Sequence, residues 1–146
     1  MRAHAPIFAM LIMIQGCARP IAPEQIIAEA TGGKLSATRG QFFAPGCNET
    51  LDYEATVVDL NGDGQPEVFT TIHGSCLGGS AGEQTNLYIK DSAGHWQPQF
   101  GFPGIPRLLR TGNGGFPDIE IGVPGFCFPV WRWDGHAYAL HKSCPH

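Results

Sequence analysis

One nine-residue stretch limits the fold of this chain more than any other part of it. From Asp59 to Glu67 the sequence reads Asp-Leu-Asn-Gly-Asp-Gly-Gln-Pro-Glu, with oxygen-bearing side chains at positions 1, 3 and 5, a glycine at 6 and an acid at 9. This alternation turns several oxygens of one short loop toward a single point, which suits a hard cation such as calcium. The stretch therefore predicts a local shape and a bound ion, but it does not name an activity.

The segments on both sides of this stretch favour β-strands. Within residues 51–58 apolar side chains recur at every second position, at Leu51, Tyr53, Ala55 and Val57. Residues 68–72 are all β-branched or aromatic. The stretch is thus predicted to connect the two strands of a hairpin. An EF-hand would instead need flanking helices and an acid at position 12, where this chain has Thr70.

The predicted calcium ligands are four side chains and one backbone carbonyl. The side chains are those of Asp59, Asn61, Asp63 and Glu67, and the carbonyl is that of Gln65. Water would complete the coordination shell. The alternative interpretation is an Asx-rich turn that holds no metal.

The eleven residues that begin at Asp59, Asp-Leu-Asn-Gly-Asp-Gly-Gln-Pro-Glu-Val-Phe, resemble the FG-GAP/VCBS-type repeat of extracellular β-propellers and adhesion modules. In those repeats a strand–loop–strand binds calcium, so the resemblance implies a structural calcium ion here. It covers residues 57–69 and is specific for the loop rather than for a whole fold. Glu67 stands where an aspartate is usual, and two blade-like units are fewer than the roughly four that a propeller needs.

The N-terminus has the composition of a signal peptide. Arg2 precedes an unbroken apolar run over residues 6–14, which is too short to span a bilayer. The run ends in Ile-Gln-Gly-Cys, which resembles the lipobox of bacterial lipoproteins, although Gln15 departs from the small residue that is usual there. We expect residues 1–16 to be removed, Cys17 to be lipidated and residues 17–22 to form a tether. The alternative is an ordinary secretory signal cleaved nearby, with Cys17 left as an odd thiol.

Lipidation implies a protein that is anchored to a membrane and does not span it. Ala18 follows Cys17 where an aspartate would change the sorting, so the resemblance implies the periplasmic side of the outer membrane in a Gram-negative-type envelope. The net charge is −4 and no Lys/Arg cluster is present. Without a basic face the chain has no surface suited to nucleic acid.

The other four cysteines form an even set, which an exported chain normally pairs in disulfides. The first hairpin centres near residue 63, so Cys47 and Cys76 come close to opposite positions. A strong two-residue turn at 134–135 likewise brings Cys127 and Cys144 close to opposite positions of the last hairpin. We therefore predict disulfides Cys47–Cys76 and Cys127–Cys144. Reactive or zinc-bound thiols are the alternative, but no CxxC spacing supports them.

Frequent turn residues, 20 glycines and 12 prolines, favour many short strands. One short helix is predicted over residues 23–30, because Pro23 precedes good helix formers and Gly32-Gly33 follows them. Further strands are predicted over residues 87–90, 95–97, 107–111, 126–133 and 136–141, and a flexible connector over 75–86. The predicted fold is mainly β, with two consecutive four-stranded antiparallel units, one short N-terminal helix and disulfide staples.

These units make residues 23–146 a single domain with a possible degenerate duplication, 51–100 and 105–142. Chance similarity in a glycine-rich chain is the alternative. The second unit repeats the loop as Asn-Gly-Gly-Phe-Pro-Asp, in which only Asn113 and Asp118 remain of the oxygen ligands. No metal is therefore predicted there. In its last hairpin Trp131 and Trp133 share one face, as core or as an exposed platform, and Arg132 is expected to face solvent.

The chain has neither a His-Glu-x-x-His pair nor a Ser-x-x-Lys motif. Residues 78–82 match Gly-x-Ser-x-Gly, but no helix is predicted after them, so they do not predict a nucleophile elbow. No catalytic residue is assigned. The predicted function is a non-enzymatic binding module that recognises a protein or glycan in the envelope, one version being a small inhibitor or immunity protein that plugs an enzyme's cleft. The alternative is an envelope hydrolase whose Ser, His and Asp meet only in space.

Overall fold

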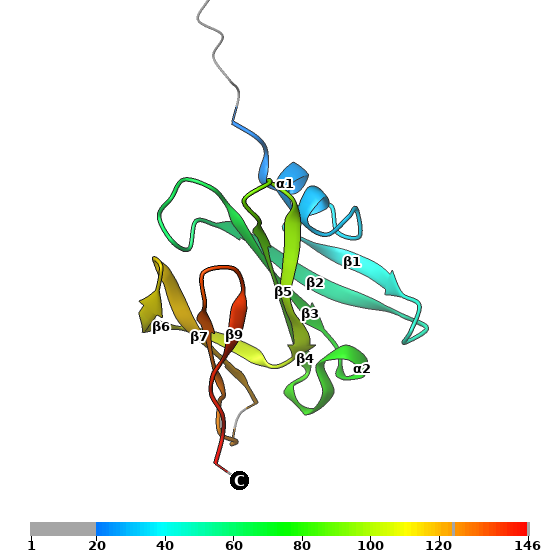
Figure 1. Cartoon of the computed structure of the whole chain (residues 1–146). Helices are drawn as coiled ribbons and strands as arrows, with labels where there is room; N and C mark the ends of the chain where they lie inside the picture. Colours follow the sequence, from blue (N-terminus) through cyan, green and yellow to red (C-terminus); the bar gives the residue numbers. More distant parts are fainter. Residues whose placement is uncertain (1–19, 124, 146) are drawn as a thin grey trace, which may run out of the picture.

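The computed structural model describes residues 20–123 and 125–145, which form two antiparallel sheets (Figure 1). The first sheet has the strand order β1-β2-β3-β4-β5 and the second β6-β7-β8-β9. The elements in chain order are α1 (Pro23–Ala30), β1 (Arg39–Ala44), β2 (Glu49–Val58), β3 (Glu67–His73), α2 (Ser75–Gly78), the 3₁₀ turn η1 (Gly79–Ala81), β4 (Glu83–Lys90), β5 (Trp96–Pro103), β6 (Ile105–Asn113), β7 (Phe116–Gly122), β8 (Val130–Trp133) and β9 (Tyr138–Lys142).

This architecture confirms the mainly-β prediction of two consecutive antiparallel units. Strands β2 to β5 and β6 to β9 each form a meander in chain order, and β1 adds a fifth strand to the first sheet. The common origin of the two units stays a prediction. The predicted signal peptide, residues 1–16, and Cys17 lie outside the described residues.

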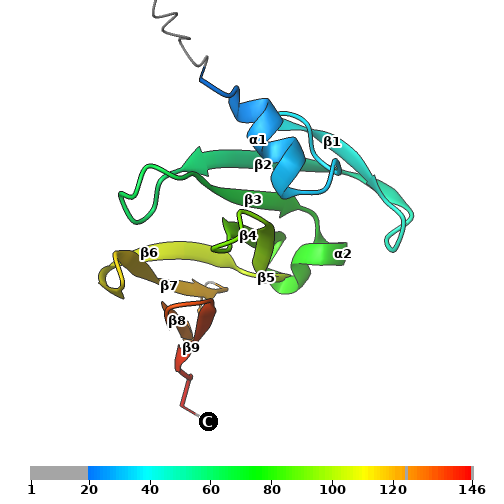
Figure 2. The same cartoon turned by 45° about the horizontal axis from the view of Figure 1, so that its top comes forward.

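The first core lies between α1 and one face of the first sheet, as Figure 2 shows. Ile27 and Ala30, three positions apart on α1, are both buried against β2, whose inward residues alternate as the sequence predicted. The helix begins at Pro23 as expected. After its last turn the Thr31 hydroxyl donates to the Ile27 carbonyl at 2.8 Å and accepts from the Leu35 N–H at 3.1 Å. These bonds fix the helix against the sheet.

The second core joins the other face of the first sheet to the second sheet. Leu87, Ile89 and Phe100 pack there against residues of β7 and β9: Phe116, Ile119, Ile121 and Tyr138. The two tryptophans of β8 also pack on this cluster, with 4.5 Å between the ring centroids of Phe116 and Trp133. Of the two roles considered for this tryptophan pair, the core role is correct.

A single residue carries the chain from one sheet to the other. Strand β5 ends at Pro103 and β6 begins at Ile105, with only Gly104 between them. Gly104 is buried at φ 145°, and a Cβ atom there would lie 2.6 Å from the Ile121 side chain. Its N–H donates to the Glu83 carbonyl at 2.9 Å. Only glycine therefore fits this crossing.

Two segments differ from the predictions. The glycine-rich stretch 75–86 is an ordered path through α2, η1 and the start of β4, because Gly78 packs directly on the Glu83 backbone. Strand β8 begins at Val130 rather than at residue 126, since Pro129 before it has no amide hydrogen for a ladder bond. Phe126 lies outside the strand and its side chain is exposed.

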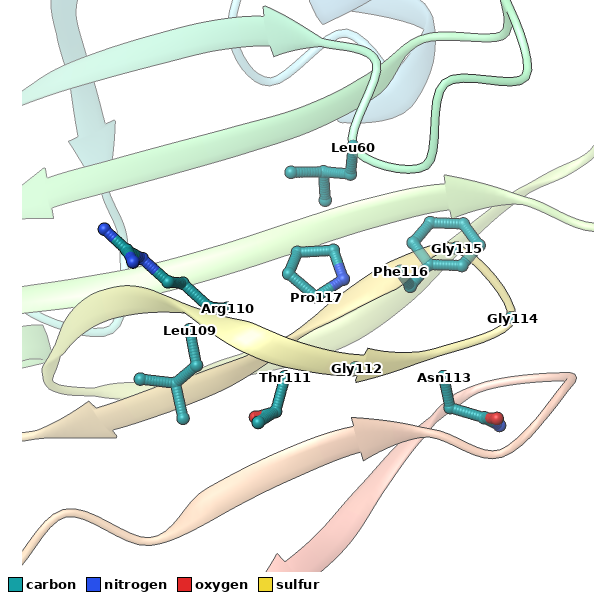
Figure 3. A pocket seen from close by; sticks show the side chains of 10 residues that line it. All are labelled: Leu60, Leu109, Arg110, Thr111, Gly112, Asn113, Gly114, Gly115, Phe116 and Pro117. Carbon is teal, nitrogen blue, oxygen red and sulfur yellow. The ribbon is translucent and has the colours of Figure 1, made fainter.

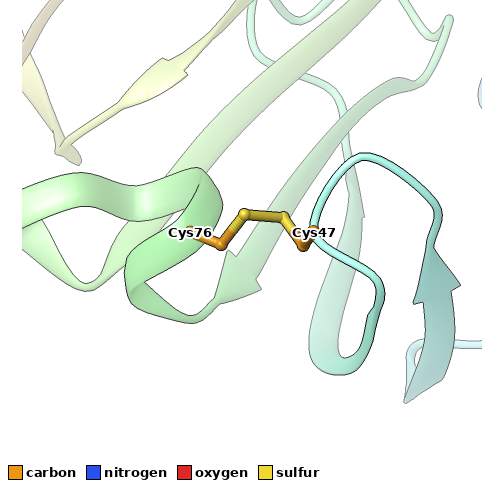
Figure 4. Close-up of a disulfide and its surroundings, with 2 residues drawn as sticks. All are labelled: Cys47 and Cys76. Carbon is orange, nitrogen blue, oxygen red and sulfur yellow. A yellow bond between two sulfur atoms is a disulfide. The ribbon is translucent and has the colours of Figure 1, made fainter.

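Both predicted disulfides are present. Cys47–Cys76 joins the β1–β2 turn to α2, with 6.0 Å between the Cα atoms (Figure 4). Cys127–Cys144 joins the segments before β8 and after β9, with 5.6 Å between the Cα atoms. Each pair flanks one antiparallel hairpin, so strand pairing alone brings its two cysteines together.

Candidate metal loop and the adjacent groove

The loop from Asp59 to Glu67 connects β2 and β3, as predicted, and backbone donors orient its side-chain oxygens. The Asp59 carboxylate accepts hydrogen bonds from the N–H groups of Gly62 at 2.8 Å and Gly64 at 2.9 Å. Asn61 and Asp63 each accept from the N–H two residues later, at 3.1 Å and 2.7 Å. Both glycines have the left-handed φ expected of them, 75° and 85°.

Glu67, at the start of β3, is the buried acid of this loop. Its side chain is only 2% exposed, and the Leu60 N–H donates to Oε2 at 2.6 Å. Within the described residues it forms no ion pair. Burial raises the pKa of Glu67 to about 7; the Leu60 hydrogen bond opposes this rise, and the charges of Asp63 and Asp59 add to it. An ionised carboxylate here lacks the cation that buried charges require.

Asp118 holds the corresponding place in the second unit, directly after a proline at the start of a strand. It is 1% exposed, and Arg132 donates to both of its oxygens, at 2.8 and 2.7 Å. The Thr111 hydroxyl donates to it at 2.6 Å. The hydrogen bond from Arg132 is the main reason that the pKa of Asp118 falls to about 2.

The prediction that Arg132 faces solvent is correct only in part, because its side chain is 35% exposed but its guanidinium pairs with Asp118. Ile119 pairs with Trp131 in the β7–β8 register, so the next residues along, Asp118 and Arg132, lie side by side. Alternation alone correctly placed Arg132 on the face opposite the tryptophans. It could not show that a buried acid would meet the guanidinium there.

The donor set of the first loop fits calcium in kind, because every predicted ligand is a hard oxygen and Glu67 has no other cation. The carboxylates of Asp59, Asp63 and Glu67 do not all lie within 4.8 Å of one another. The structure therefore does not gather these three carboxylates around one point. The hydrogen bonds of the loop also suit the metal-free Asx turn, and calcium stays a prediction.

Within the described residues, the three metal-ligand atoms that do lie within 4.8 Å of one another belong to Cys47, Glu49 and Cys76. Its two sulfur atoms form a disulfide, which removes the thiolates that a metal would bind. This cluster is not a metal site.

The loop from Asp59 to Glu67 packs against the β6–β7 turn. A Cβ atom on Gly115 would lie 3.2 Å from the Asn61 carbonyl oxygen and 3.3 Å from the Asn61 Cβ atom. Beside this contact is a cavity of about 390 Å³, lined by Leu60 and residues 109–117 (Figure 3). The two turns therefore form one structural unit at this end of the molecule.

A second cavity, of about 320 Å³, shares Leu60 with the first and extends between the two sheets. Its walls come from β2, β3 and β6: Thr56, Val58, Phe69, Thr71, Pro106 and Leu108. We call the two adjoining cavities the β6 groove. Leu108 is 50% exposed there although it is fully apolar. Sequence reasoning missed this groove, because it depends on how the sheets pack.

The hydrolase alternative requires a cluster of Ser, His and Asp. A cavity of about 330 Å³ includes Asp91, Ser92 and His136 in its lining. The Asp91 carboxylate accepts from the N–H groups of Ala93 and His95, both at 2.9 Å, and so caps its own turn. No hydrogen bond joins Ser92, His136 and Asp91 in the part of the chain that the structure describes. These residues give a nucleophile no visible base.

Comparisons with protein-family models, with curated proteins and with solved structures found no match to this chain. Across residues 20–123 and 125–145, no helix has the length and apolar character needed to cross a membrane.

Proposed function

We propose that this protein is a non-enzymatic binding module, held on the periplasmic side of the outer membrane by a lipid on Cys17, and that it recognises its partner through the β6 groove. The exposure of Leu108 beside the half-buried Phe69 and Val58 carries the proposal. Contiguous apolar surface open to solvent marks interaction sites on proteins that are otherwise well packed.

Calcium has a structural role in this proposal. The ion would be held by the predicted ligands, namely Asp59, Asn61, Asp63, the Gln65 carbonyl and Glu67. It would supply the positive charge that the buried Glu67 lacks, and it would stiffen the turn that rests on Gly115. Because Leu60 belongs to both the loop and the groove, a fixed loop also fixes one end of the binding surface.

The partner is a protein or glycan of the envelope. A rigid scaffold with two disulfides and a fixed loop loses little conformational freedom on binding, which favours tight recognition. This is the property that a small inhibitor or immunity protein needs to block an enzyme's cleft.

Isothermal titration with calcium tests the metal. We expect a one-site isotherm for the wild type and about a tenfold or greater loss of affinity in Asp59→Asn, because affinity follows the number of charged ligands. The matched control is Asp134→Asn, since Asp134 also accepts from two backbone N–H groups, at 2.8 and 2.9 Å, in a turn with no predicted ion. A flat wild-type titration would remove calcium from the proposal.

Capture from detergent-solubilised envelope tests the binding function. The lipidated protein is cross-linked in cells with and without calcium, and retained molecules are identified after washing. We expect one dominant partner that is lost when Leu108 is replaced by arginine. Recovery of no specific partner under either condition would contradict the proposal.

A further inference from the structure

Strand β6 is an edge strand. It pairs with β7 on one side, regularly from Ile105 to Leu108, and it ends the strand order of the second sheet on the other. The unpaired edge of β6 presents C=O groups and the N–H groups of residues other than Pro106, which has none, and another extended chain can pair with these groups. The groove therefore lies beside a template for strand addition.

The side chains beside this edge alternate in the way that an added strand would meet. Pro106 and Leu108, two positions apart on β6, both line the groove, opposite Val58 and Phe69 of the first sheet. The threonines at 56 and 71 line the same cavity. An extended segment would thus place alternate side chains against an apolar wall and the others away from it.

Arg110 extends this row at the end nearest the calcium loop. Figure 3 shows its side chain on the same side of β6 as Leu60, whereas Leu109 and Thr111 point the other way. Arg39, Arg107 and Arg132 each have a carboxylate partner. Within residues 20–123 and 125–145, Arg110 has none. An unpaired guanidinium at the end of an apolar groove favours a carboxylate on the bound molecule.

We propose that an extended segment of the partner protein binds along the free edge of β6 as an added strand, with apolar side chains at alternate positions in the groove and an acidic side chain at Arg110. This inference rests on the proposed binding function and names the partner as a protein. Main-chain bonds would supply affinity, and the groove with Arg110 would supply sequence preference.

A display library of random ten-residue peptides, selected on the full chain in calcium buffer, tests this inference. We expect enriched sequences with apolar residues at every second position and one acidic residue. Leu108→Arg should weaken the best peptide by at least about tenfold, the scale of a central contact. The matched control is Leu140→Arg, because Leu140 is 54% exposed on β9, the opposite edge of the same sheet. It should bind within about twofold of wild type.

A charge exchange tests Arg110 separately. Arg110→Glu should weaken the acidic peptide about tenfold, and replacing the acidic residue of the peptide by lysine should restore binding to that variant. Hydrogen exchange should show new protection of β6 amides. Absence of enrichment, a pattern without alternation, or equal binding to both leucine variants would overturn the inference.

Other occupants of the groove give different results. If light scattering shows a wild-type dimer that Leu108→Arg dissociates, a second copy of the chain fills the groove. If peptidoglycan fragments displace the peptide, the groove binds a glycan. Either result overturns the inference. With a partner from the envelope capture in hand, equal retention by the Leu108→Arg and Leu140→Arg variants refutes strand addition alone. Failure to capture any partner refutes the binding function itself.

Discussion

The β2–β3 and β6–β7 connections solve the same electrostatic problem in different ways. Each brings an acid into the interior directly after a proline, Glu67 in the first and Asp118 in the second. Asp118 receives the guanidinium of Arg132, and its pKa falls to about 2. Glu67 meets one backbone N–H and two nearby acids, and its pKa rises to about 7. Arg132 thus supplies a cation to the buried acid of the second unit. Within the described residues Glu67 has no such partner, and calcium is the cation predicted there.

The largest expected effect comes from removing the internal cation. Arg132→Met leaves Asp118 as an unpaired buried carboxylate, which costs about 3 kcal/mol of unfolding free energy. Urea denaturation at pH 7 measures it. The control is Arg39→Met, whose partner Glu54 is exposed, so the change should stay below about 1 kcal/mol. Equal losses in both variants would show that the Arg132–Asp118 pair contributes no more than an exposed ion pair.

The pH dependence of stability should distinguish the two acids. Without calcium, Glu67 keeps its proton in the folded state until about pH 7, while the unfolded chain releases it near the ordinary glutamate pKa of 4.5. The folded state then binds more protons, so stability falls as pH rises between these values, by an amount on the order of 3 kcal/mol.

Asp118 has the opposite dependence. Its folded pKa lies below the ordinary aspartate value of 3.8, so its contribution to stability is complete above that pH and is lost as pH falls toward 2. Urea midpoints between pH 2 and 8 measure both. Glu67→Gln should remove only the loss of stability between pH 4.5 and about 7, and calcium should raise the stability of the wild type in that range. If Glu67→Gln loses stability there as the wild type does, the assignment to Glu67 is wrong.

The smallest expected effect concerns the contact between the two turns. Gly115→Ala adds a methyl group against Asn61 at a left-handed φ of 84°, so we expect a loss of about 1–2 kcal/mol and weaker calcium binding. Gly94→Ala is the control, since Gly94 has nearly the same φ, 83°, and open space around it. The difference between the variants measures the contact. Equal losses would mean that the turns do not support each other.

Local patterns were enough to predict the hairpins and both disulfides. Alternation from Leu51 to Val57 and the turn at 134–135 depend on neighbouring residues, and each disulfide flanks one hairpin. Strand β1 was not predicted, because residues 34–47 show no clear period. The order in α2 depends on Gly78 meeting the Glu83 backbone, a contact that no sequence period reveals.

The site was predictable only in part. The acids of the Asp59–Glu67 loop stand at a spacing that indicates a cation, and the loop joins β2 and β3 as expected. The burial of Glu67 and its contrast with Asp118 depend on packing, as does the pairing of Asp118 with Arg132 through the β7–β8 register. The groove was not predictable, because it requires the relative placement of two sheets joined at Gly104.

That joint has a mechanical consequence. Each disulfide closes a loop within one sheet, so in the described chain only the backbone at Gly104 links the sheets covalently. If the first sheet is tethered to a membrane through Cys17 and a partner pulls on β6, the force passes through the contacts of Leu87, Ile89 and Phe100 with the second sheet. The two sheets would separate at this interface before force reaches either disulfide, and they would rotate relative to each other about Gly104.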